Sequence, residues 1–263
     1  MASESKFPSS PWLPWLSVAS VALALVAWQV VATSGIVAPE LLASPELVFG
    51  ALVEILRDGY RGTTLQQNVV ATLGRCLIGF LLAVALGVPL GLWMGLQPRV
   101  SAALGDIVQF LRPLPPLSYM ILLILWFGTG DGSKVVLLFL TALPIIASAA
   151  MAGVRGVPQN RILAARSLGA SFPQVVWNVV LPSSLPSLFT GLRIALAAAF
   201  STVVASELLA ATDGLGWMVL SASRFLRNDV ILLGIIILGL TGMALGKGLQ
   251  MIERRLVHWH GRG

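Results

Sequence analysis

Residues 163–171 read Leu-Ala-Ala-Arg-Ser-Leu-Gly-Ala-Ser, and residues 179–182 read Val-Val-Leu-Pro. This stretch interrupts a very apolar chain with small and polar side chains, which are not typical of a membrane-crossing segment. Its small residues, Ala164, Ala165 and Gly169, would let the backbone of another protein approach closely. The stretch therefore predicts a docking surface outside the membrane. The alternative is a surface or re-entrant loop that contains ordinary small residues.

The composition of the whole chain predicts an all-α integral membrane protein. Hydrophobic residues make up 57% of the chain and charged residues 11%, whereas soluble domains are about 25% charged. The mean hydropathy is +0.89. A membrane-spanning helix needs roughly 20 mostly apolar residues. Long windows without charge predict six such spans, at about 13–34, 74–96, 107–127, 135–153, 185–206 and 230–250.

The N-terminal run, the single cysteine and the two histidines further limit what kind of membrane protein this is. Lys6 is offset by Glu4 and the first apolar run is long, so we expect an uncleaved first span rather than a signal peptide. The single cysteine, Cys76, lies in an apolar run, so neither a disulfide nor a metal site within one chain is expected. The two histidines, His258 and His260, flank a tryptophan near the C-terminus, which is typical of a tail at the membrane surface.

The distribution of positive charge predicts the orientation. With six spans, both termini lie on one side of the membrane. If that side is the cytoplasm, nine basic residues lie inside and five outside, which is the direction of the positive-inside rule. The inner set is Lys6, Arg99, Arg155, Arg161, Arg166, Lys247, Arg254, Arg255 and Arg262, and the outer set is Arg57, Arg61, Lys134, Arg224 and Arg227. The net charge of +6 then indicates orientation and anionic lipid contact, and no nucleic-acid partner is expected.

The organisation along the chain predicts a single domain over residues 1–263, with a cytoplasmic loop at about 155–183. Residues 35–70 form an outer connection, and the run 46–58 has the pattern of a helix at the membrane interface. Residues 207–229 are expected to be an outer re-entrant or surface segment. Within them Thr212–Gly216 is a strong turn signal.

The opening stretch resembles the cytoplasmic "EAA" loop of ATP-binding-cassette (ABC) importer permeases. The shared features are two alanines, a glycine four residues after the second, and the Leu-Pro ending. The family consensus begins with glutamate where this chain has Leu163, so the ion pair that such a glutamate makes with the ATPase is in doubt. The resemblance implies that the loop docks onto an ATPase, with Leu168 and Phe172 also supplying apolar contacts. The residues expected to carry this coupling are Arg161, Leu163, Ala164, Ala165, Arg166, Ser167, Leu168, Gly169, Ala170 and Ser171.

Other motifs are similar to the nitrate/sulfonate/taurine branch of these permeases. They are Arg112–Leu117, Trp126–Gly128, Gly191–Arg193, Glu207–Thr212, Gly214–Gly216 and Trp259–Gly261, the last of which resembles taurine permeases in particular. The resemblance implies a type I ABC importer permease in the bacterial inner membrane, paired as a homodimer. It also implies two ATPase subunits that hold ATP and Mg, a periplasmic binding protein, and no cofactor or catalytic site on this chain. The solute implied is taurine or a related small sulfonate, with nitrate or another small anion as the alternative.

Two other classes of membrane protein fit the sequence less well. Ion-coupled secondary transporters usually place ionisable residues near the bilayer midplane, and the second, fourth and sixth charge-free windows hold no acidic residue. An intramembrane enzyme would need a catalytic motif, and the chain has neither Gly-x-Ser-x-Gly nor His-Glu-x-x-His. Both classes are therefore disfavoured.

Arg112 and three nearby prolines are candidates for the transport pathway or a gate. A charge near membrane depth is costly. Pro113, Pro115 and Pro116 remove three N–H donors, so the backbone there cannot be a regular helix. Irregular backbone at depth is tolerated where it lines a cavity or is buried in protein. The alternative is that Arg112 extends to the inner interface beside a kink.

Arg193 and Glu207 are also pathway candidates, since both flank apolar segments. On one continuous helix, the 14 residues between them would span roughly 21 Å, so they cannot pair with each other. We expect them to mark the two ends of the fifth span. The alternative is that each pairs with another helix, for example Glu207 with Arg112.

Overall fold

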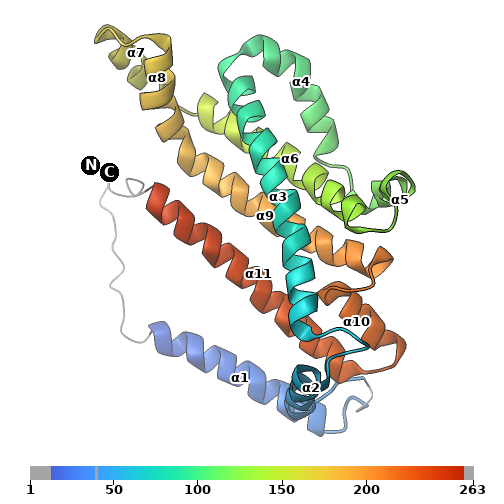
Figure 1. Ribbon diagram of the computed structural model, residues 1–263. Coiled ribbons are helices and arrows are strands. Elements are labelled where there is room, and N and C mark those ends of the chain that lie inside the picture. The colour runs from blue at the N-terminus through green and yellow to red at the C-terminus, as the bar shows by residue number, and fades with distance from the viewer. Residues whose placement is uncertain (1–12, 39–40, 258–263) are drawn as a thin grey trace.

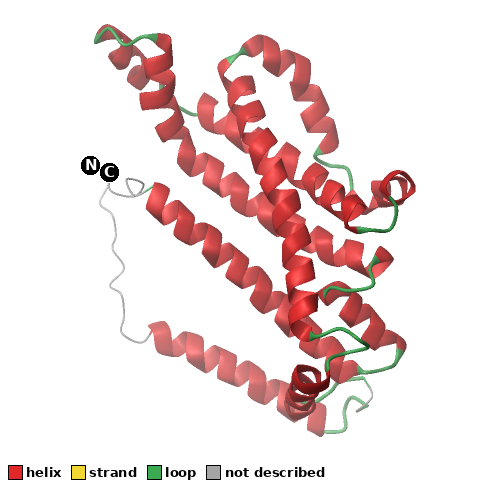
Figure 2. Cartoon of the chain, viewed as in Figure 1, coloured by secondary structure: helices red, strands yellow, loops and turns green. Residues whose placement is uncertain are grey.

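The computed structural model describes residues 13–38 and 41–257, which fold as helices joined by short loops (Figures 1 and 2). Extended structure in these ranges is confined to an isolated bridge between Tyr60 and Thr63. The helices are α1 (Leu13–Thr33), α2 (Pro45–Asp58), α3 (Leu65–Leu96), α4 (Pro98–Leu111), α5 (Pro116–Phe127), α6 (Asp131–Arg155), α7 (Gln159–Ser167), α8 (Phe172–Val175), the π-helical turn η1 (Val176–Val180), α9 (Leu181–Ala210), α10 (Leu215–Arg224) and α11 (Asn228–Leu256).

Helices α3, α6 and α9 lie side by side at the centre of the molecule (Figure 1). Their backbones approach closely because α3 presents glycines to α6. A Cβ atom added to Gly91 would lie 2.2 Å from the carbonyl oxygen of Ala147, and one added to Gly95 would lie 2.6 Å from Cβ of Val154. Small residues at such positions are the usual way in which membrane helices pack tightly.

An apolar core fills the space between these three helices and reaches α11. It includes Phe80 from α3, Ile146 from α6, Leu192 and Val203 from α9, and Leu249 from α11. This core holds the central helices together as one packed unit.

Within the described ranges, four helical segments are long and apolar enough to cross a membrane: Leu65–Leu96, Asp131–Arg155, Phe172–Ala210 and Asn228–Leu256. The bent pair α4–α5 makes a fifth if it is counted as one span. Each contains one of the spans expected from the sequence, and α1 covers the remaining one. The chain is therefore a multi-pass membrane protein.

The third expected span, 107–127, is wrong as a single helix. It is divided between α4 and α5, whose axes differ by 97°. The prolines at 113, 115 and 116 explain the break, because proline lacks the N–H that would continue the helix and disfavours the helical conformation of the residue before it.

The remaining helices lie around the bundle. Helix α1 stands apart from the bundle and meets the rest of the chain near α2, where Trp28 Nε1 donates a hydrogen bond to the Ala43 carbonyl at 3.1 Å (Figure 1). Helix α2 confirms the helix expected at 46–58, and α10 lies within the expected surface segment. Helices α7 and α8 project at one end of the molecule, whereas α2 and α10 lie at the opposite end (Figure 1).

Candidate functional site

The polar stretch at 163–171 forms most of a short projecting helix, α7, and the turn that leads to α8 (Figure 1). No residue of α7 is buried. On one side, Ile162 and Ala165 pack partly against an apolar cluster that includes Val154 and Val175. The opposite side carries Leu163, which is 54% exposed.

Gly169 ends α7 in the left-handed conformation, with φ of +83°. The Ala170 N–H donates to the Ala165 carbonyl at 3.1 Å, and the Gly169 N–H donates to the Arg166 carbonyl at 2.9 Å. These two bonds form a Schellman motif, in which glycine is favoured because it has no Cβ. Gly169 therefore has a structural reason for its identity besides the close approach of a partner.

The expected coupling residues divide into an outward-facing and an inward-facing set. Those exposed to solvent are Arg161, Leu163, Ala164, Arg166, Ser167, Leu168, Gly169 and Ser171, whereas Ala165 and Ala170 are half-buried. Leu168 is 90% exposed, although its side chain is apolar. Ser171 begins α8 by a capping box with Gln174, whose Oε1 accepts the Ser171 N–H at 2.8 Å. The free surface of this segment is therefore apolar and basic.

Arg112 ends α4 at the break before α5. Beside it lies a pocket of about 320 Å³ between α4, α5, α6 and α9. Its lining includes the polar side chains of Arg112, Tyr119, Thr141, Ser201 and Thr202. Of the prolines expected at a gate, Pro116 lines this pocket, while Pro113 and Pro115 are exposed in the connecting turn.

Arg193 lies within α9 and forms an ion pair with Glu253 of α11. Because α9 begins at Leu181, the expectation that Arg193 marks the start of this span is wrong. The other expectation, that Arg193 and Glu207 cannot pair with each other, holds, since each has its own partner on another helix.

Glu207 is fully buried near the end of α9. Its Oε1 accepts from Nη1 of Arg75 at 2.9 Å and from Oγ1 of Thr72 at 2.9 Å, and its Oε2 accepts from the Gly216 N–H at 2.9 Å. The suggested pairing of Glu207 with Arg112 is therefore wrong. Arg75 on α3 takes that place, while Arg112 lines a separate pocket that Thr141 and Ser201 also line.

Arg75, which is itself almost fully buried, is the centre of a cluster that reaches the surface. Besides Glu207, its guanidinium pairs with Asp131 at the start of α6, with Nε 2.7 Å from Oδ1, and with the carboxylate of Asp213 in the α9–α10 loop. The Asp213 carbonyl also accepts from Nη1 at 3.0 Å. Three carboxylates around one guanidinium tie α3, α6, α9 and the α9–α10 loop together.

The α9–α10 loop fits over the cluster because it contains glycines. A Cβ atom added to Gly214, which has φ of +112°, would lie 2.4 Å from Cδ of Glu207. One added to Gly216 would lie 2.6 Å from the Val204 carbonyl oxygen. Two further bonds fix the loop to α3: the Gly214 N–H donates to Oδ1 of Asn68 at 2.8 Å, and the Leu215 N–H donates to Oγ1 of Thr72 at 2.9 Å.

Sequence reasoning found Glu207 and the glycine turn but missed Arg75, Asp131 and Asp213 as their partners. Arg75 lies just inside the N-terminal edge of the second expected span, 74–96. In the structure α3 begins at Leu65, so Arg75 lies inside the helix. The signal in the sequence was thus a charged residue just inside an expected span, whose helix begins earlier than predicted.

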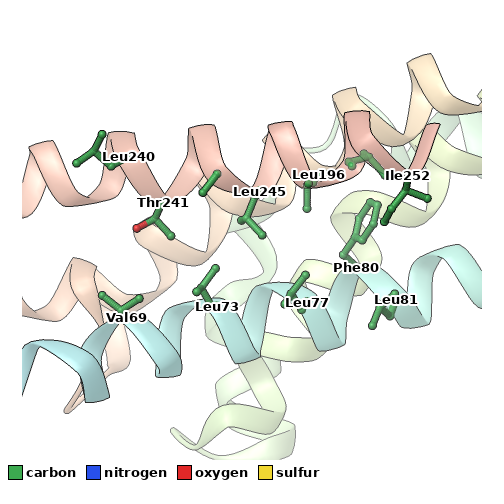
Figure 3. Close-up of a pocket in the computed structure, with 13 residues that line it drawn as sticks. Val69, Leu73, Leu77, Phe80, Leu81, Leu196, Leu240, Thr241, Leu245 and Ile252 are labelled. Atoms are coloured by element: carbon green, nitrogen blue, oxygen red, sulfur yellow. The ribbon is translucent and has the colours of Figure 1, made fainter. Parts of the chain in front are cut away.

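A second pocket shows where a charged solute would not bind. It is a groove of about 620 Å³ between α3, α9 and α11, and Figure 3 shows that its labelled side chains are apolar apart from the hydroxyl of Thr241. Leu73, Leu77 and Phe80 line it from α3. Such a lining offers no charge to an anion.

Metal-binding chemistry has no visible basis in the described ranges, where no group of three His, Cys, Asp or Glu side chains could hold an ion. His258, His260 and the Trp259–Gly261 motif lie outside the described residues.

Comparisons with known proteins identify the family. The family described as "binding-protein-dependent transport system inner membrane component" matches residues 87–258. The chain belongs to this family. It is 44% identical to the taurine transport system permease protein TauC of Escherichia coli (strain K12), over 94% of this chain and 90% of that protein. It is 33% identical to the nitrate import permease protein NrtB of Leptolyngbya laminosa, over 77% and 74%.

Solved structures confirm the fold. The inward-facing MetNI methionine ABC transporter contains a chain with a TM-score of 0.60 and 22% identity, covering 73% of this chain and 95% of that one. A chain of an amino acid ABC transporter with histidines gives a TM-score of 0.58 at 18% identity, covering 80% and 97%. This chain is therefore an ABC transporter permease with the importer fold, and it belongs to the nitrate/sulfonate/taurine branch.

Proposed function

We propose that this permease forms the membrane pathway of an ATP-driven importer for taurine or a related short sulfonate. The observation that carries the proposal is the 44% identity to a taurine permease across 94% of this chain. A sulfonate cannot cross hydrocarbon unaided, so it needs a protein-lined route. The residues proposed for that route are Arg112, Pro113, Pro115 and Pro116 at the α4–α5 break.

The roles of Arg193 and Glu207 in this proposal are more indirect. Both form ion pairs between helices, so they would hold the pathway helices in register rather than contact the solute. Whether they act on transport is tested by uptake after substitution, not by their geometry alone.

The proposed assembly contains two copies of this chain, two ABC ATPases and a periplasmic binding protein. ATP and Mg would be held by the ATPases, and this chain would bind no cofactor and catalyse no reaction. The segment Arg161–Ser171 would transmit ATPase movement to the permeases, which would then alternate between inward-open and outward-open states. This arrangement requires α7 and both termini to face the cytoplasm of a bacterial cell, with the helices in its inner membrane.

Nitrate or another small anion is the second candidate solute. The observation in its favour is the 33% identity to a nitrate permease. An ion-coupled secondary transporter is a weaker alternative, because the family is one of binding-protein-dependent systems.

The test is uptake into proteoliposomes that contain permease, ATPase and binding protein. We expect ATP-dependent uptake of labelled taurine, with none when the ATPase is left out. Uptake of nitrate without taurine would show that the proposed solute is wrong, although the permease role would stand. Uptake that runs on an ion gradient without any ATPase would contradict the whole proposal.

A further inference from the structure

We propose that the pocket at the α4–α5 break is an anion site that binds the sulfonate group of the solute, with Arg112 as its cation and nearby hydroxyl groups as hydrogen-bond partners. The proposal rests on the function proposed above and assigns the solute a contact within this chain. The pocket holds about 320 Å³, which is at the lower end of the range for small-molecule sites.

The pocket lies at the α4–α5 break, beside residues that are well inside α6 and α9. Thr141 is ten residues from the start of α6, or about 15 Å along the helix axis. Thr202 is eight residues before the end of α9, or about 12 Å. Since the hydrocarbon core of a bilayer is about 30 Å thick, a solute in this pocket would lie within the membrane rather than at its surface.

Arg112 differs from the other arginines in the apolar segments. Arg75 and Arg193 each pair with a carboxylate on another helix, but among residues 13–38 and 41–257 no carboxylate forms an ion pair with Arg112. A guanidinium at membrane depth is costly without a counter-charge. An anionic solute would supply that charge, and the planar guanidinium can donate two parallel hydrogen bonds to the oxygens of a sulfonate.

The helix break also places the N-terminus of α5 beside the pocket. Pro116 is the first residue of α5, and both it and Tyr119 line the cavity. The N-terminus of α5 therefore adjoins the pocket, and the positive end of a helix dipole favours an anion. Interrupted helices whose half-helix N-termini face anionic groups are also a recurring design in other membrane transporters.

Hydroxyl groups complete the polar lining. Thr141 and Thr202 line the pocket from α6 and α9, and Ser201 lies beside Thr202. The Ser201 hydroxyl donates to the Ala197 carbonyl at 3.0 Å, and that of Thr141 donates to the Leu137 carbonyl at 2.8 Å. A hydroxyl can rotate to donate to an anion instead. No carboxylate lines this pocket, so its chemistry suits the sulfonate of an amino-sulfonate rather than its ammonium group.

The test measures binding of labelled taurine to the assembled permease–ATPase complex in lipid nanodiscs, without the binding protein. We expect saturable binding that ethanesulfonate displaces and ethylammonium does not. Arg112→Gln should weaken binding about 10- to 100-fold, the range for hydrogen bonds to charged groups. Tyr119→Phe removes only a hydroxyl from the pocket lining and should weaken binding severalfold. It provides a second probe of the pocket if Arg112→Gln impairs folding.

Arg99→Gln is the matched control. Arg99 is also exposed and lies on α4, but it does not line the pocket, so its substitution should leave binding unchanged. The site is refuted if wild-type complex shows no saturable binding, if ethylammonium competes as well as ethanesulfonate, or if neither Arg112→Gln nor Tyr119→Phe weakens binding. Uptake by the complete wild-type transporter separates the two proposals: uptake without binding refutes only this site, whereas absence of taurine uptake refutes the proposed solute.

Discussion

Glu207 and Arg75 show how a few residues control the end of the bundle near α10. Both are almost fully buried, and their bonds join α3, α9 and the loop that leads to α10. A buried ion pair contributes little net stability compared with apolar packing, but removing one partner leaves an uncompensated charge and costs about 3–5 kcal/mol. The cluster should therefore tolerate little change at either residue.

Glu207→Gln tests this at constant size. The amide group places an NH₂ donor among the donors of Arg75, Thr72 and the Gly216 N–H, so two donors would face each other. We expect a clear fall in the melting temperature of the detergent-solubilised complex, measured by a thermal-shift assay. Arg227→Gln removes a partly exposed arginine that pairs with Glu54 and Asp229 and should cost roughly 0–1 kcal/mol per pair. Equal shifts for the two variants would contradict the argument.

Gly214→Ala tests the loop that covers the cluster. The new Cβ would lie 2.4 Å from Cδ of Glu207, at a backbone φ of +112° that alanine rarely adopts. We expect a low yield of folded protein in size-exclusion chromatography. Gly132→Ala is the control, since nothing lies within 4 Å of a Cβ at that position in α6. A folded, fully stable Gly214→Ala variant would show that the loop can move away from Glu207.

Individual functional residues were predictable from the sequence when the unfavourable feature, a charge beside an apolar run, was visible in the neighbouring residues. Glu207 and Arg112 stood out because each is a charge beside an apolar run. Their partners did not, because Arg75 and Glu207 are 132 residues apart and meet only through the packing of α3 against α9. Arg193 was expected at the start of its span because a charge usually marks the end of an apolar segment, but it lies within α9 and pairs with Glu253.

At the scale of elements, α7 was predictable as a polar interruption but its orientation was not. The sequence placed Ala164, Ala165 and Gly169 on one docking face. In the structure Ala165 packs inward against the apolar cluster that includes Val154 and Val175, while Ala164 and Leu168 are exposed. The inner side of α7 is fixed by contacts with residues on either side of it in the chain, which no local pattern reveals.

Leu168→Asp tests docking by the outward face of α7. Leu168 is 90% exposed, so aspartate should leave the fold intact while placing a charge where an apolar contact with the ATPase is proposed. We expect loss of the co-expressed ATPase in a pull-down from solubilised membranes, with normal permease levels. Leu226→Asp is the control, because Leu226 is 83% exposed in the turn between α10 and α11. This change is preferable to Gly169→Trp, which would also disrupt the Schellman motif at the end of α7.

ATPase retention by Leu168→Asp would contradict the proposed docking face.

The α4–α5 break was likewise predictable in its position but not in its geometry. Three prolines predicted irregular backbone near Arg112, and the structure confirms it. The 97° bend between the two helices was not predictable, because it depends on how α5 packs against α6 and α9.

At the scale of the whole molecule, the composition predicted the fold class, and the comparisons confirm the importer permease fold. Of the six expected spans, four are single helices long enough to cross a membrane, the third is bent at the α4–α5 break, and the first coincides with the shorter apolar helix α1. The orientation in the membrane is still a prediction from charge. It has a simple geometric consequence, because α7 lies at the end of the molecule opposite to α2 and α10 (Figure 1). If α7 faces the cytoplasm, then α2 and α10 face outward.

Cysteine labelling in intact cells tests this orientation. Cys76 is fully buried, so Cys76→Ala gives a background with no reactive thiol at little cost in volume. Into it we would place Leu168→Cys in the turn after α7 and, separately, Gly132→Cys at the start of α6, both of which are exposed. A membrane-impermeant maleimide should label only the cysteine at 132, and the one at 168 should react only after the membrane is opened. The reverse pattern would refute the positive-inside assignment together with cytoplasmic docking of α7, because an ATPase in the cytoplasm could not then reach Leu168.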